Sequence, residues 1–336
     1  MNYSNGYISV IGAGSWGTTL ASLLAEKGYD VILWSHEKEV VESISHSNEN
    51  NIYLPGIKLP ANLKATDDIE EATAKSRYIL NAVPTQYIRT VFSLIKPCIR
   101  NECIIISASK GIENNTLLTP SMVLKEILAR PVVVLSGPSF AKEVIAKLPT
   151  AVTLATEDRK TGLLLQEIFN TDYFRVYTHD DITGVEIGGA LKNVIAIASG
   201  ISDGLGLGYN SRAALITRGL AEITRLGIAM GAKEVTFSGL SGLGDLVLTC
   251  TSHLSRNYTV GHELGKGVKL SEITGRTKYI AEGVTTAISA YELLKKYGID
   301  LPITEQVYLT VCKDKSPAEA VRDLMNRSLK SEFYGY

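Results

Sequence analysis

Hydrophobic positions in the first half of the chain fall into short runs, and between most of these runs apolar residues recur every three or four positions. Short apolar runs bounded by turn residues predict buried strands, whereas the longer period predicts helices that pack on a sheet. The expected strands span residues 7–11, 30–34, 78–83, 103–107, 132–135, 151–155 and 174–177, and the expected helices include residues 16–27, 86–96, 117–129 and 159–169. This alternation predicts an α/β fold with a doubly wound, mostly parallel sheet.

The pattern changes after about residue 180, where the strand-like runs of β-branched residues end. Apolar residues then recur at helical spacing in residues 182–201, 212–230, 284–297 and 317–329, and glycine-rich segments at 203–208 and 238–244 separate these stretches. A chain of 336 residues is long enough for two hydrophobic cores. We therefore expect an α/β domain over residues 1–180 and an all-helical C-terminal domain over residues 181–336.

The charge of the chain is nearly balanced, with 34 basic and 35 acidic residues and a net charge of −1. Proteins that bind nucleic acid usually carry a basic surplus, so we expect no nucleic-acid partner. The cysteines form no C-x-x-C pair and the histidines show no H-E-x-x-H spacing, so we expect no metal site. The polar residues 1–7 do not resemble a signal peptide, and we expect a cytoplasmic protein.

One apolar stretch, residues 185–201, is long enough to be considered as a membrane span. It contains Glu186, Lys192 and Asn193. Each charged residue near the centre of a bilayer would cost about 2.5–3.5 kcal/mol, so no membrane span is expected. The stretch is better interpreted as a buried core helix.

A glycine-rich turn follows the first expected strand and opens the first expected helix, with the sequence Gly12-Ala13-Gly14-Ser15-Trp16-Gly17. In this position the G-x-G-x-x-G pattern is typical of the βαβ unit that opens a Rossmann-type, dinucleotide-binding domain. Gly12 permits the tight turn, Gly14 lets the backbone approach the pyrophosphate, and Gly17 lets the helix and the strand pack closely. Unpaired N–H groups at the helix N-terminus supply the anion site.

The choice of coenzyme is predicted from the residues after the second expected strand. An acidic side chain there would bind the ribose 2′-hydroxyl of NAD(H) and repel the 2′-phosphate of NADP(H). Ser35 and His36 follow the strand and Lys38 is near, which favours acceptance of NADP(H) with NAD(H) also usable. Glu37, twenty residues after Gly17, keeps the opposite preference open. The alternative for His36 is that it is an ordinary histidine exposed in a loop, with no role in the choice of coenzyme.

Lys192 lies within an apolar helical stretch, and no carboxylate is available on its own helical face. Its neighbours three and four positions away are Gly188, Gly189, Ile195 and Ala196. Burial of the amine in a cleft would lower its pKa and suit a neutral general base, and the glycine pair would leave room for a ligand. An ordinary ion pair between the domains is the alternative.

Three further polar segments are candidates for the same site. Lys110, in the segment 109–111, follows an expected strand at the carboxyl edge, where open α/β sheets bind ligands. Asp245 lies on a glycine-rich loop, where it could orient the Lys192 ammonium or, alternatively, cap a helix. The segment 255–257, Ser-Arg-Asn, places a guanidinium beside an amide and suits a phosphate dianion, although such a trio is more often surface decoration.

The sequence resembles the NAD(P)-dependent sn-glycerol-3-phosphate dehydrogenases, in their bacterial form, over nearly its whole length. The resemblance rests on several long matching segments in the same order, at residues 10–21, 136–143, 188–197, 215–222 and 242–251. Such a series is more specific than any single motif. The resemblance implies a Rossmann-type domain that binds the dinucleotide and a helical domain that binds the substrate and performs catalysis.

The resemblance also implies a role for each matching position. Lys192 would accept the proton of the substrate's secondary alcohol. Around the reacting carbon would lie Lys110, Asn193, Asp245 and Thr249, with further substrate contacts from Gly137 and Ser139 and the phosphate held by Ser255, Arg256 and Asn257. The cofactor contacts would be Gly12, Gly14, Ser15, Trp16, Gly17, His36, Lys110, Ala141, Arg256, Ile280 and Glu282.

The implied reaction is reversible hydride transfer between sn-glycerol 3-phosphate and dihydroxyacetone phosphate, with NADP(H) or NAD(H), and it supplies glycerol phosphate for phospholipid synthesis. The resemblance also implies a homodimer. Two alternatives are a related β-hydroxyacid dehydrogenase, in which Arg256 and Asn257 would clamp a carboxylate, and a non-catalytic module that senses dinucleotides. A sensing module has no need of Lys192 together with Asp245, whereas a dehydrogenase uses both.

Overall fold

The structure, a computed structural model, describes residues 7–276 and 281–332. Contacts within the chain divide it into two compact units. The first contains the described residues up to Ser109 together with Pro120–Ile182, and the second contains Lys110–Thr119 together with the described residues from Thr183 onward. The segment Lys110–Thr119 thus follows a strand of the first unit but packs in the second, for which the sequence offers no signal. The ranges 1–180 and 181–336 stay a prediction of where the domains divide.

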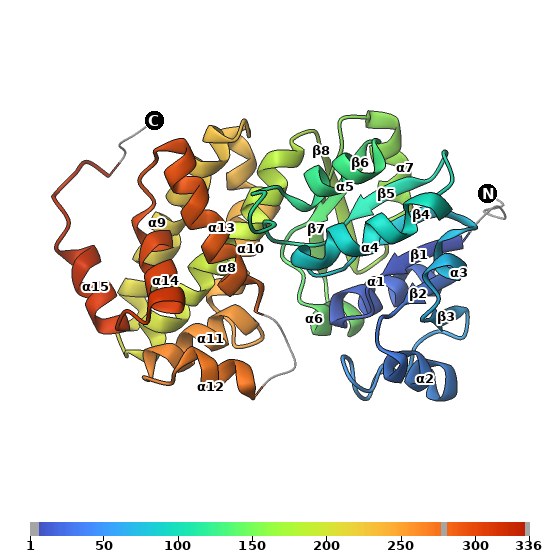
Figure 1. The fold of residues 1–336 in the computed structure, drawn as a ribbon, viewed down its shortest axis with the longest axis horizontal. Helices are drawn as coiled ribbons and strands as arrows, with labels where there is room; N and C mark the ends of the chain where they lie inside the picture. The colour runs from blue at the N-terminus through green and yellow to red at the C-terminus, as the bar shows by residue number, and fades with distance from the viewer. Residues whose placement is uncertain (1–6, 277–280, 333–336) are drawn as a thin grey trace. The chain divides into compact units, whose positions relative to one another are not determined.

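The first unit is built on one eight-stranded sheet with the order β3-β2-β1-β4-β5-β6-β7-β8 (Figure 1). Its strands are β1 (Tyr7–Ile11), β2 (Val31–Trp34), β3 (Leu63–Thr66), β4 (Ser76–Asn81), β5 (Ile104–Ser107), β6 (Val132–Ser136), β7 (Thr150–Ala155) and β8 (Phe174–His179). Neighbouring strands are parallel except β6 and β7. The order reverses between β1 and β4, and open α/β sheets bind ligands at the carboxyl edge of such a switch point.

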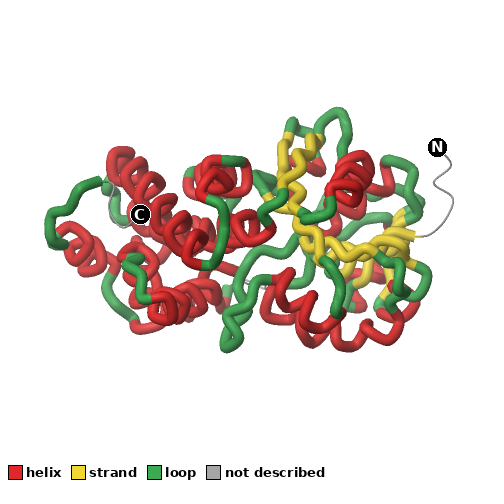
Figure 2. The backbone as a smooth tube through the Cα atoms, turned by 90° about the horizontal axis from the view of Figure 1, so that it is seen from above, coloured by secondary structure: helices red, strands yellow, loops and turns green. Residues whose placement is uncertain are grey.

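Helices lie on both sides of this sheet, as Figure 2 shows. They are α1 (Ser15–Glu26), α2 (Lys38–Ser47), α3 (Ile69–Thr73), α4 (Ile88–Ile95), α5 (Pro120–Leu128), α6 (Ala141–Ile145) and α7 (Arg159–Phe169), with short helical turns η1 (Thr85–Tyr87) and η2 (Lys96–Cys98). Because both faces are covered, strand residues such as Val10, Leu33 and Leu80 are fully buried. This two-sided burial explains the continuous apolar runs from which the strands were predicted.

The predicted strands are all present, and the doubly wound, mostly parallel sheet is confirmed. The sequence missed β3, an edge strand in which only Leu63 and Thr66 are buried, so that no apolar run marks it. The helix predicted over residues 117–129 begins later, at Pro120. Leu117 adopts a φ of +62°, which lies outside the helical region.

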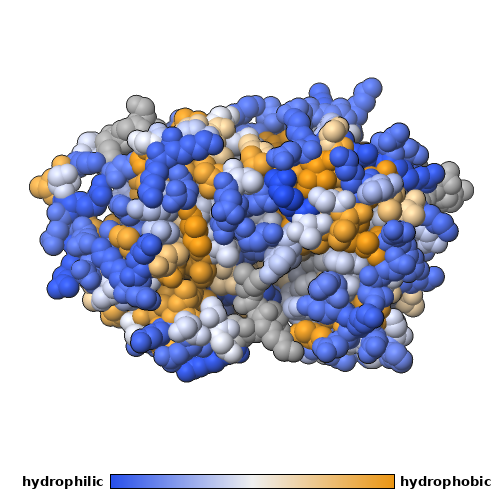
Figure 3. Space-filling model, viewed as in Figure 1, coloured by the Kyte–Doolittle hydropathy of each residue, from blue (hydrophilic) through white to orange (hydrophobic). Residues whose placement is uncertain are grey.

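The second unit is helical, as predicted. Its helices are α8 (Ile182–Gly204), α9 (Gly208–Ala229), α10 (Asp245–Cys250), α11 (Arg256–Gly265), α12 (Leu270–Gly275), α13 (Glu282–Tyr297), α14 (Pro302–Lys313) and α15 (Pro317–Met325), with helical turns η3 (Glu234–Ser238) and η4 (Leu240–Gly244). Among the described residues, α8 is the helix long and apolar enough to cross a membrane, but 94% of its apolar window is buried inside the protein. It is therefore a core helix, as expected. Hydrophilic residues cover much of the surface visible in Figure 3.

Two glycines let α8 and α11 touch. An added Cβ at Gly200 would lie 2.0 Å from the carbonyl oxygen of Tyr258, and one at Gly261 would lie 2.1 Å from that of Ile197. A side chain at either position would push the helices apart. The pair therefore holds α8, which carries Lys192, directly against α11.

Candidate active site

The glycine-rich turn joins β1 to α1 where the strand order reverses. Gly12 has a φ of +110°, and an added Cβ at Gly17 would lie 1.9 Å from the Gly12 carbonyl oxygen, so both positions require glycine. An added Cβ at Gly14 would meet no atom within 4 Å, and α1 has no side-chain hydrogen bond at its N-cap. The turn therefore offers open space and backbone N–H groups, which fit the pyrophosphate of a dinucleotide.

The other cofactor residues predicted beside this turn lie on α1 and α6. Ser15 Oγ donates to the Tyr53 carbonyl oxygen at 2.9 Å. Trp16 Nε1 is buried and has no hydrogen-bond partner in the part of the chain that the structure describes, so this donor suits a ligand. Ala141 begins α6, and its carbonyl oxygen accepts a hydrogen bond from Thr19 Oγ1 at 3.4 Å, which ties α6 to α1.

His36 and Glu37 follow β2, and both residues are exposed. The His36 ring lies 6.4 Å from the Trp34 ring between centroids, tilted by 46°. The Glu37 carboxylate accepts hydrogen bonds from Tyr53 Oη at 2.5 Å and from Ser35 Oγ at 3.1 Å. Hydrogen bonds thus hold a carboxylate in place at this strand end.

Of the other residues predicted to contact the substrate or the cofactor, some lie in the first unit and some in the second. Gly137 and Ser139 lie in the first unit, on the loop after β6, where Ser139 Oγ donates to the Gly137 carbonyl oxygen at 2.9 Å. Glu282 is the first residue of α13 in the second unit. Ile280 lies outside the described residues.

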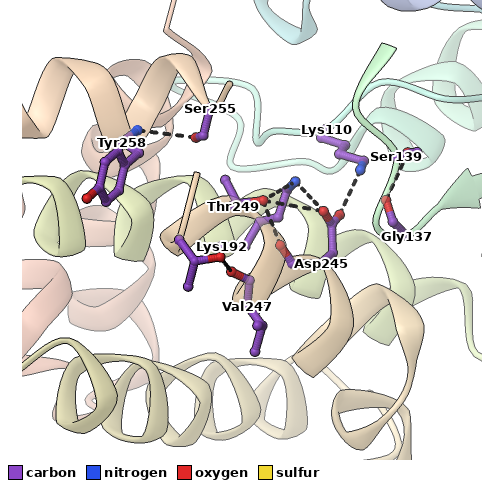
Figure 4. A network of polar contacts seen from close by, with 10 residues as sticks. Lys110, Gly137, Ser139, Lys192, Asp245, Val247, Thr249, Ser255 and Tyr258 are labelled. Carbon is purple, nitrogen blue, oxygen red and sulfur yellow. Dashed lines mark hydrogen bonds and ion pairs between the residues drawn. The ribbon is translucent and has the colours of Figure 1, made fainter. Parts of the chain in front are cut away.

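Polar side chains that are distant in sequence meet around Asp245 in the second unit (Figure 4). Lys192 Nζ lies 2.5 Å from Asp245 Oδ1 and 2.8 Å from Thr249 Oγ1. Lys110 Nζ lies 2.7 Å from Asp245 Oδ2, so each carboxylate oxygen binds one amine. Asn193, which follows Lys192 on α8, is buried as well. The structure therefore brings together Lys192, Lys110, Asp245 and Thr249, four of the five residues predicted around the reacting carbon.

Burial lowers the pKa of Lys192 to about 8, because desolvation disfavours the charged form of the amine. The Asp245 carboxylate opposes this shift, and the Lys110 ammonium adds to it. A pKa near 8 makes both protonation states of the amine accessible at neutral to alkaline pH. Such a group can accept a proton as an amine and donate one as an ammonium.

The local backbone explains how Asp245 reaches Lys192. Gly244 is the N-cap of α10 and Asp245 its first helical residue, so the alternative that Asp245 caps the helix is wrong. An added Cβ at Gly188 would lie 2.5 Å from the Ser241 carbonyl oxygen. The space beside Gly188 is thus filled by the turn η4, and the expectation that this glycine leaves room for a ligand is wrong. The ion pair forms within the second unit and not between domains.

The trio predicted to bind phosphate forms the N-terminus of α11. Ser255 is the N-cap, and its Oγ accepts a hydrogen bond from the Tyr258 N–H at 3.2 Å. Arg256 is exposed at the first helical position. Asn257 is buried, and its Oδ1 accepts from the Gly283 N–H at 2.9 Å, which leaves the Nδ2 group as the side of this amide that can bind an anion.

Sequence reasoning missed two buried asparagines of the first unit. Asn81 ends β4, and its Nδ2 donates to Ser107 Oγ at 3.2 Å and Ser109 Oγ at 3.0 Å, which ties two strand ends together. A polar residue directly after an apolar run was a usable signal for it. Asn50 donates to the Ala13 carbonyl oxygen at 2.9 Å, within the glycine-rich turn. It lies in a polar segment without periodicity, which carries no such signal.

Two family profiles match this chain and cover most of it. The profile described as the N-terminus of NAD-dependent glycerol-3-phosphate dehydrogenase matches residues 7–162. The profile described as the C-terminus of the same enzyme matches residues 181–322.

Individual proteins are similar to this chain over almost their full length. The glycerol-3-phosphate dehydrogenase (NAD(P)+) of Citrifermentans bemidjiense is 55% identical over 329 residues, which cover 97% of this chain and 98% of the relative. That of Geobacter sulfurreducens is 54% identical over 329 residues, with 97% and 98% covered. The crystal structure of glycerol-3-phosphate dehydrogenase from Coxiella burnetii has a TM-score of 0.93 at 42% identity, with 96% of this chain and 99% of that chain covered.

Proposed function

The chain belongs to the NAD-dependent glycerol-3-phosphate dehydrogenase family and has the activity of a glycerol-3-phosphate dehydrogenase (NAD(P)+), and we propose that the side chains around Asp245 form its catalytic centre. The reaction is hydride transfer between sn-glycerol 3-phosphate and dihydroxyacetone phosphate. The observation that carries the proposal is the buried Lys192 amine, paired with Asp245 and with a pKa lowered to about 8. Because the chain belongs to this family, the alternatives of a β-hydroxyacid dehydrogenase and of a dinucleotide-sensing module are no longer proposed.

Lys192 is the proposed acid and base of the reaction. In the direction of oxidation, its neutral amine takes the proton of the C2 hydroxyl while C2 loses a hydride, so that the O–H and C–H bonds break and a carbonyl forms. In the direction of reduction, its ammonium returns the proton to the C2 oxygen. When bound, the coenzyme accepts or supplies the hydride at its nicotinamide C4. Asp245 stabilises the ammonium from 2.5 Å away.

Lys110, Thr249 and Asn193 complete the proposed centre. Thr249 Oγ1 accepts from Lys192 Nζ at 2.8 Å and donates to the Asp245 carbonyl oxygen at 2.6 Å, so it restrains the amine to one position. Lys110 and Asn193 are donors that can stabilise the negative charge that develops on the C2 oxygen during reduction. Because Lys110 is anchored on Asp245, this stabilisation requires little reorganisation.

The N-terminus of α11 is the proposed phosphate site. A helix N-terminus favours anions, Arg256 adds a guanidinium, and Asn257 adds its Nδ2 donors. Binding energy at this end of the substrate would orient the reacting carbon at the other end. Further proposed substrate contacts are Ser255, Gly137 and Ser139.

NAD(P)(H) is the coenzyme of this family, and we assign its pyrophosphate to the turn between β1 and α1. The open space at Gly14 and the unpartnered Trp16 N–H, judged among the described residues, support this assignment. Among the described residues, the proposed cofactor contacts are Gly12, Gly14, Ser15, Trp16, Gly17, His36, Lys110, Ala141, Arg256 and Glu282, and Ile280, which lies outside them, is proposed as well.

The enzyme is further proposed to be a cytoplasmic homodimer that supplies glycerol phosphate for phospholipid synthesis. Large apolar side chains of the second unit are strongly exposed, including Tyr209 at 83%, Val235 at 70% and Met325 at 80%. A second copy would remove such side chains from water. Light scattering on the purified protein tests this, because a mass near 36.4 kDa would identify a monomer and contradict the dimer.

The catalytic proposal is tested by following NADH and NADPH oxidation with dihydroxyacetone phosphate. Lys192→Ala should lower kcat by about 10²–10⁴-fold, the usual contribution of a general acid or base, while coenzyme binding persists. Lys295→Ala is the matched control, because this exposed lysine of α13 pairs with the surface residue Glu292 and lies over the ring of Tyr291 on the same helix. A loss of less than about tenfold in Lys192→Ala would remove this residue as the acid and base.

A further inference from the structure

The segment 110–119 carries Lys110 into the second unit. It follows β5 and leads into α5, which both belong to the first unit, while the segment itself packs in the second. Ile112 is fully buried in the hydrophobic core of the second unit, and Leu117 packs against the same core. The chain thus leaves the first unit for ten residues and brings one lysine to Asp245, where Lys110 Nζ lies 2.7 Å from Oδ2 (Figure 4).

Hydrogen bonds close this segment on itself. The Glu113 N–H donates to the Leu118 carbonyl oxygen at 2.8 Å, the Leu117 N–H donates to the Glu113 carbonyl oxygen at 3.0 Å, and Thr116 Oγ1 donates to the Glu113 carboxylate at 2.5 Å. Leu117 has a φ of +62°, a conformation that costs free energy in a residue with a side chain, so contacts from outside are needed to hold the loop. Because the bonds join its two halves, a contact at the far end of the segment also restrains Lys110.

Two hydroxyl groups fasten the segment to helices of the second unit. Ser289 of α13 is fully buried, and its Oγ lies 3.1 Å from the Ile112 carbonyl oxygen and 2.5 Å from Asn114 Oδ1. At the other end, Thr119 Oγ1 donates to the carboxylate of Glu186, a buried residue of α8, at 2.5 Å. The helix that carries Lys192 therefore also holds the segment that carries the second amine.

The position of Lys110 acts on Lys192 through its charge. The titratable groups that influence the Lys192 amine are Asp245, Lys110 and Cys250. The Lys110 ammonium lowers the pKa of Lys192, and the Asp245 carboxylate raises it. If Lys110 moved away from Asp245, one positive charge would leave this cluster and the pKa of Lys192 would rise. A displaced segment is thus detectable in the titration of Lys192.

We propose that Ser289 and Glu186 are positioning residues for the reaction and act through Lys110. They hold the segment 110–119 in place, so that the Lys110 ammonium stays on Asp245. From there it stabilises the negative charge on the C2 oxygen with little reorganisation. The proposal rests on the catalytic centre proposed above and extends it to one residue of α13 and one of α8.

Rates of dihydroxyacetone phosphate reduction by NADH, measured as a function of pH, test the proposal. Thr119→Val removes the hydrogen bond to Glu186, and Ser289→Ala removes the bond to Ile112. Each should lower kcat about three- to tenfold where kcat does not depend on pH, the effect of one hydrogen bond. Each should also raise the midpoint of the pH profile by about 0.3 to 0.5 units, because Lys110 is less often beside Lys192. Thr119→Ser keeps the hydroxyl and should restore both quantities.

Lys110→Ala shows whether the anchors act through this lysine. Alone, it should lower kcat by about 10²-fold and raise the midpoint by about one pH unit, because a stabilising donor and a like charge are both removed. Thr119→Val added to Lys110→Ala should change kcat by less than about twofold and leave the midpoint in place, since the lysine that the anchor positions is gone. Losses that multiply in the double variant would mean that the anchor supports the fold only, and would overturn the proposal.

Thr310→Val is the matched control. It removes a buried threonine hydroxyl from α14 of the same unit, where Thr310 Oγ1 donates to the Gln306 carbonyl oxygen at 2.9 Å. Its kcat and midpoint should equal those of the wild type even if its Tm is lower. A wild-type midpoint in both Thr119→Val and Ser289→Ala overturns the proposal while the catalytic centre stands. A wild-type kcat and midpoint in Lys110→Ala would instead contradict the proposed catalytic role of Lys110, and the positioning role with it.

Discussion

Lys192 and Lys110 bind opposite oxygens of a single buried carboxylate, Asp245, at 2.5 and 2.7 Å. Transfer of charged groups from water to a protein interior costs more than one ion pair usually returns, so an arrangement of this kind points to function more than to stability. The Lys192 side chain is 8% exposed and that of Lys110 is 17% exposed. Burial of the Lys192 amine disfavours its charged form and lowers its pKa to about 8.

The first prediction concerns the pH dependence of catalysis. Because the pKa of Lys192 is lowered to about 8, the neutral amine needed for oxidation of glycerol 3-phosphate becomes abundant as pH rises through that value. The kcat/KM for oxidation should therefore rise through about pH 8, and that for reduction should fall over the same range. Steady-state rates in both directions measure this. Profiles that rise or fall together in the two directions would contradict a shared acid and base.

The second prediction concerns Asp245→Asn, which keeps the shape of the side chain and removes its charge. Desolvation of Lys192 would then act with less opposition, so its pKa should fall further and the midpoint of the pH profile should move to lower pH. We expect kcat for reduction to drop by about 10²-fold or more, because less ammonium is available. Thr249→Val is the control, since it removes one hydrogen bond to the same amine but no charge. It should lower kcat less and leave the midpoint in place, whereas an unmoved midpoint in Asp245→Asn would contradict the role of the carboxylate.

The glycine turn and Lys192 could both be predicted from the sequence, because each differs from the hydrophobic pattern of the residues around it. A lysine in an apolar helix requires a partner, and glycines at set spacing satisfy a backbone requirement. The partner itself is harder to predict, because Asp245 lies 53 residues from Lys192 and 135 residues from Lys110. Only the tertiary path of η4 past Gly188 brings that carboxylate to the amines.

The contacts of Asn50 and Tyr53 could not be predicted at all. Both residues lie in a polar loop between α2 and β3, a strand that the sequence did not reveal. Their hydrogen bonds depend on the course of the backbone and not on periodicity or burial of apolar surface. The sequence therefore showed Glu37 as a candidate but not the tyrosine that holds it.

The third prediction concerns the phosphate site proposed at the N-terminus of α11. An added Cβ at Gly283 would lie 2.6 Å from the Asn193 carbonyl oxygen and 2.7 Å from Asn257 Oδ1. Gly283→Ala should therefore displace Asn257 and raise the KM for dihydroxyacetone phosphate about tenfold or more. Gly275→Ala is the control, because a methyl group there meets no atom within 4 Å and should leave KM unchanged. An unchanged KM in Gly283→Ala would mean that Asn257 does not help to bind the phosphate.

The fourth prediction concerns Glu222 of α9, a buried carboxylate that binds the start of α14. It accepts hydrogen bonds from the Ile303 N–H at 2.6 Å, the Thr304 N–H at 3.0 Å and Thr304 Oγ1 at 2.8 Å. Burial raises its pKa to about 7, and these hydrogen bonds oppose the shift. The folded chain therefore binds more protons than the unfolded chain between pH 4.5 and about 7. Below pH 4.5 the protonated Glu222 contributes its full stabilisation to the folded state, and this stabilisation is lost as pH rises through about 7.

Glu222→Gln removes this titration while the size of the side chain is kept. The advantage in Tm of the wild type over the variant should therefore shrink by several degrees as pH is raised from about 5 to about 8, in thermal unfolding followed by circular dichroism. Glu305→Gln removes a carboxylate from the first turn of the same helix α14 and should shift Tm by a similar amount at each pH. A constant Tm difference between the wild type and Glu222→Gln would mean that the Glu222 carboxylate stays charged throughout, with its three hydrogen bonds outweighing the cost of burial.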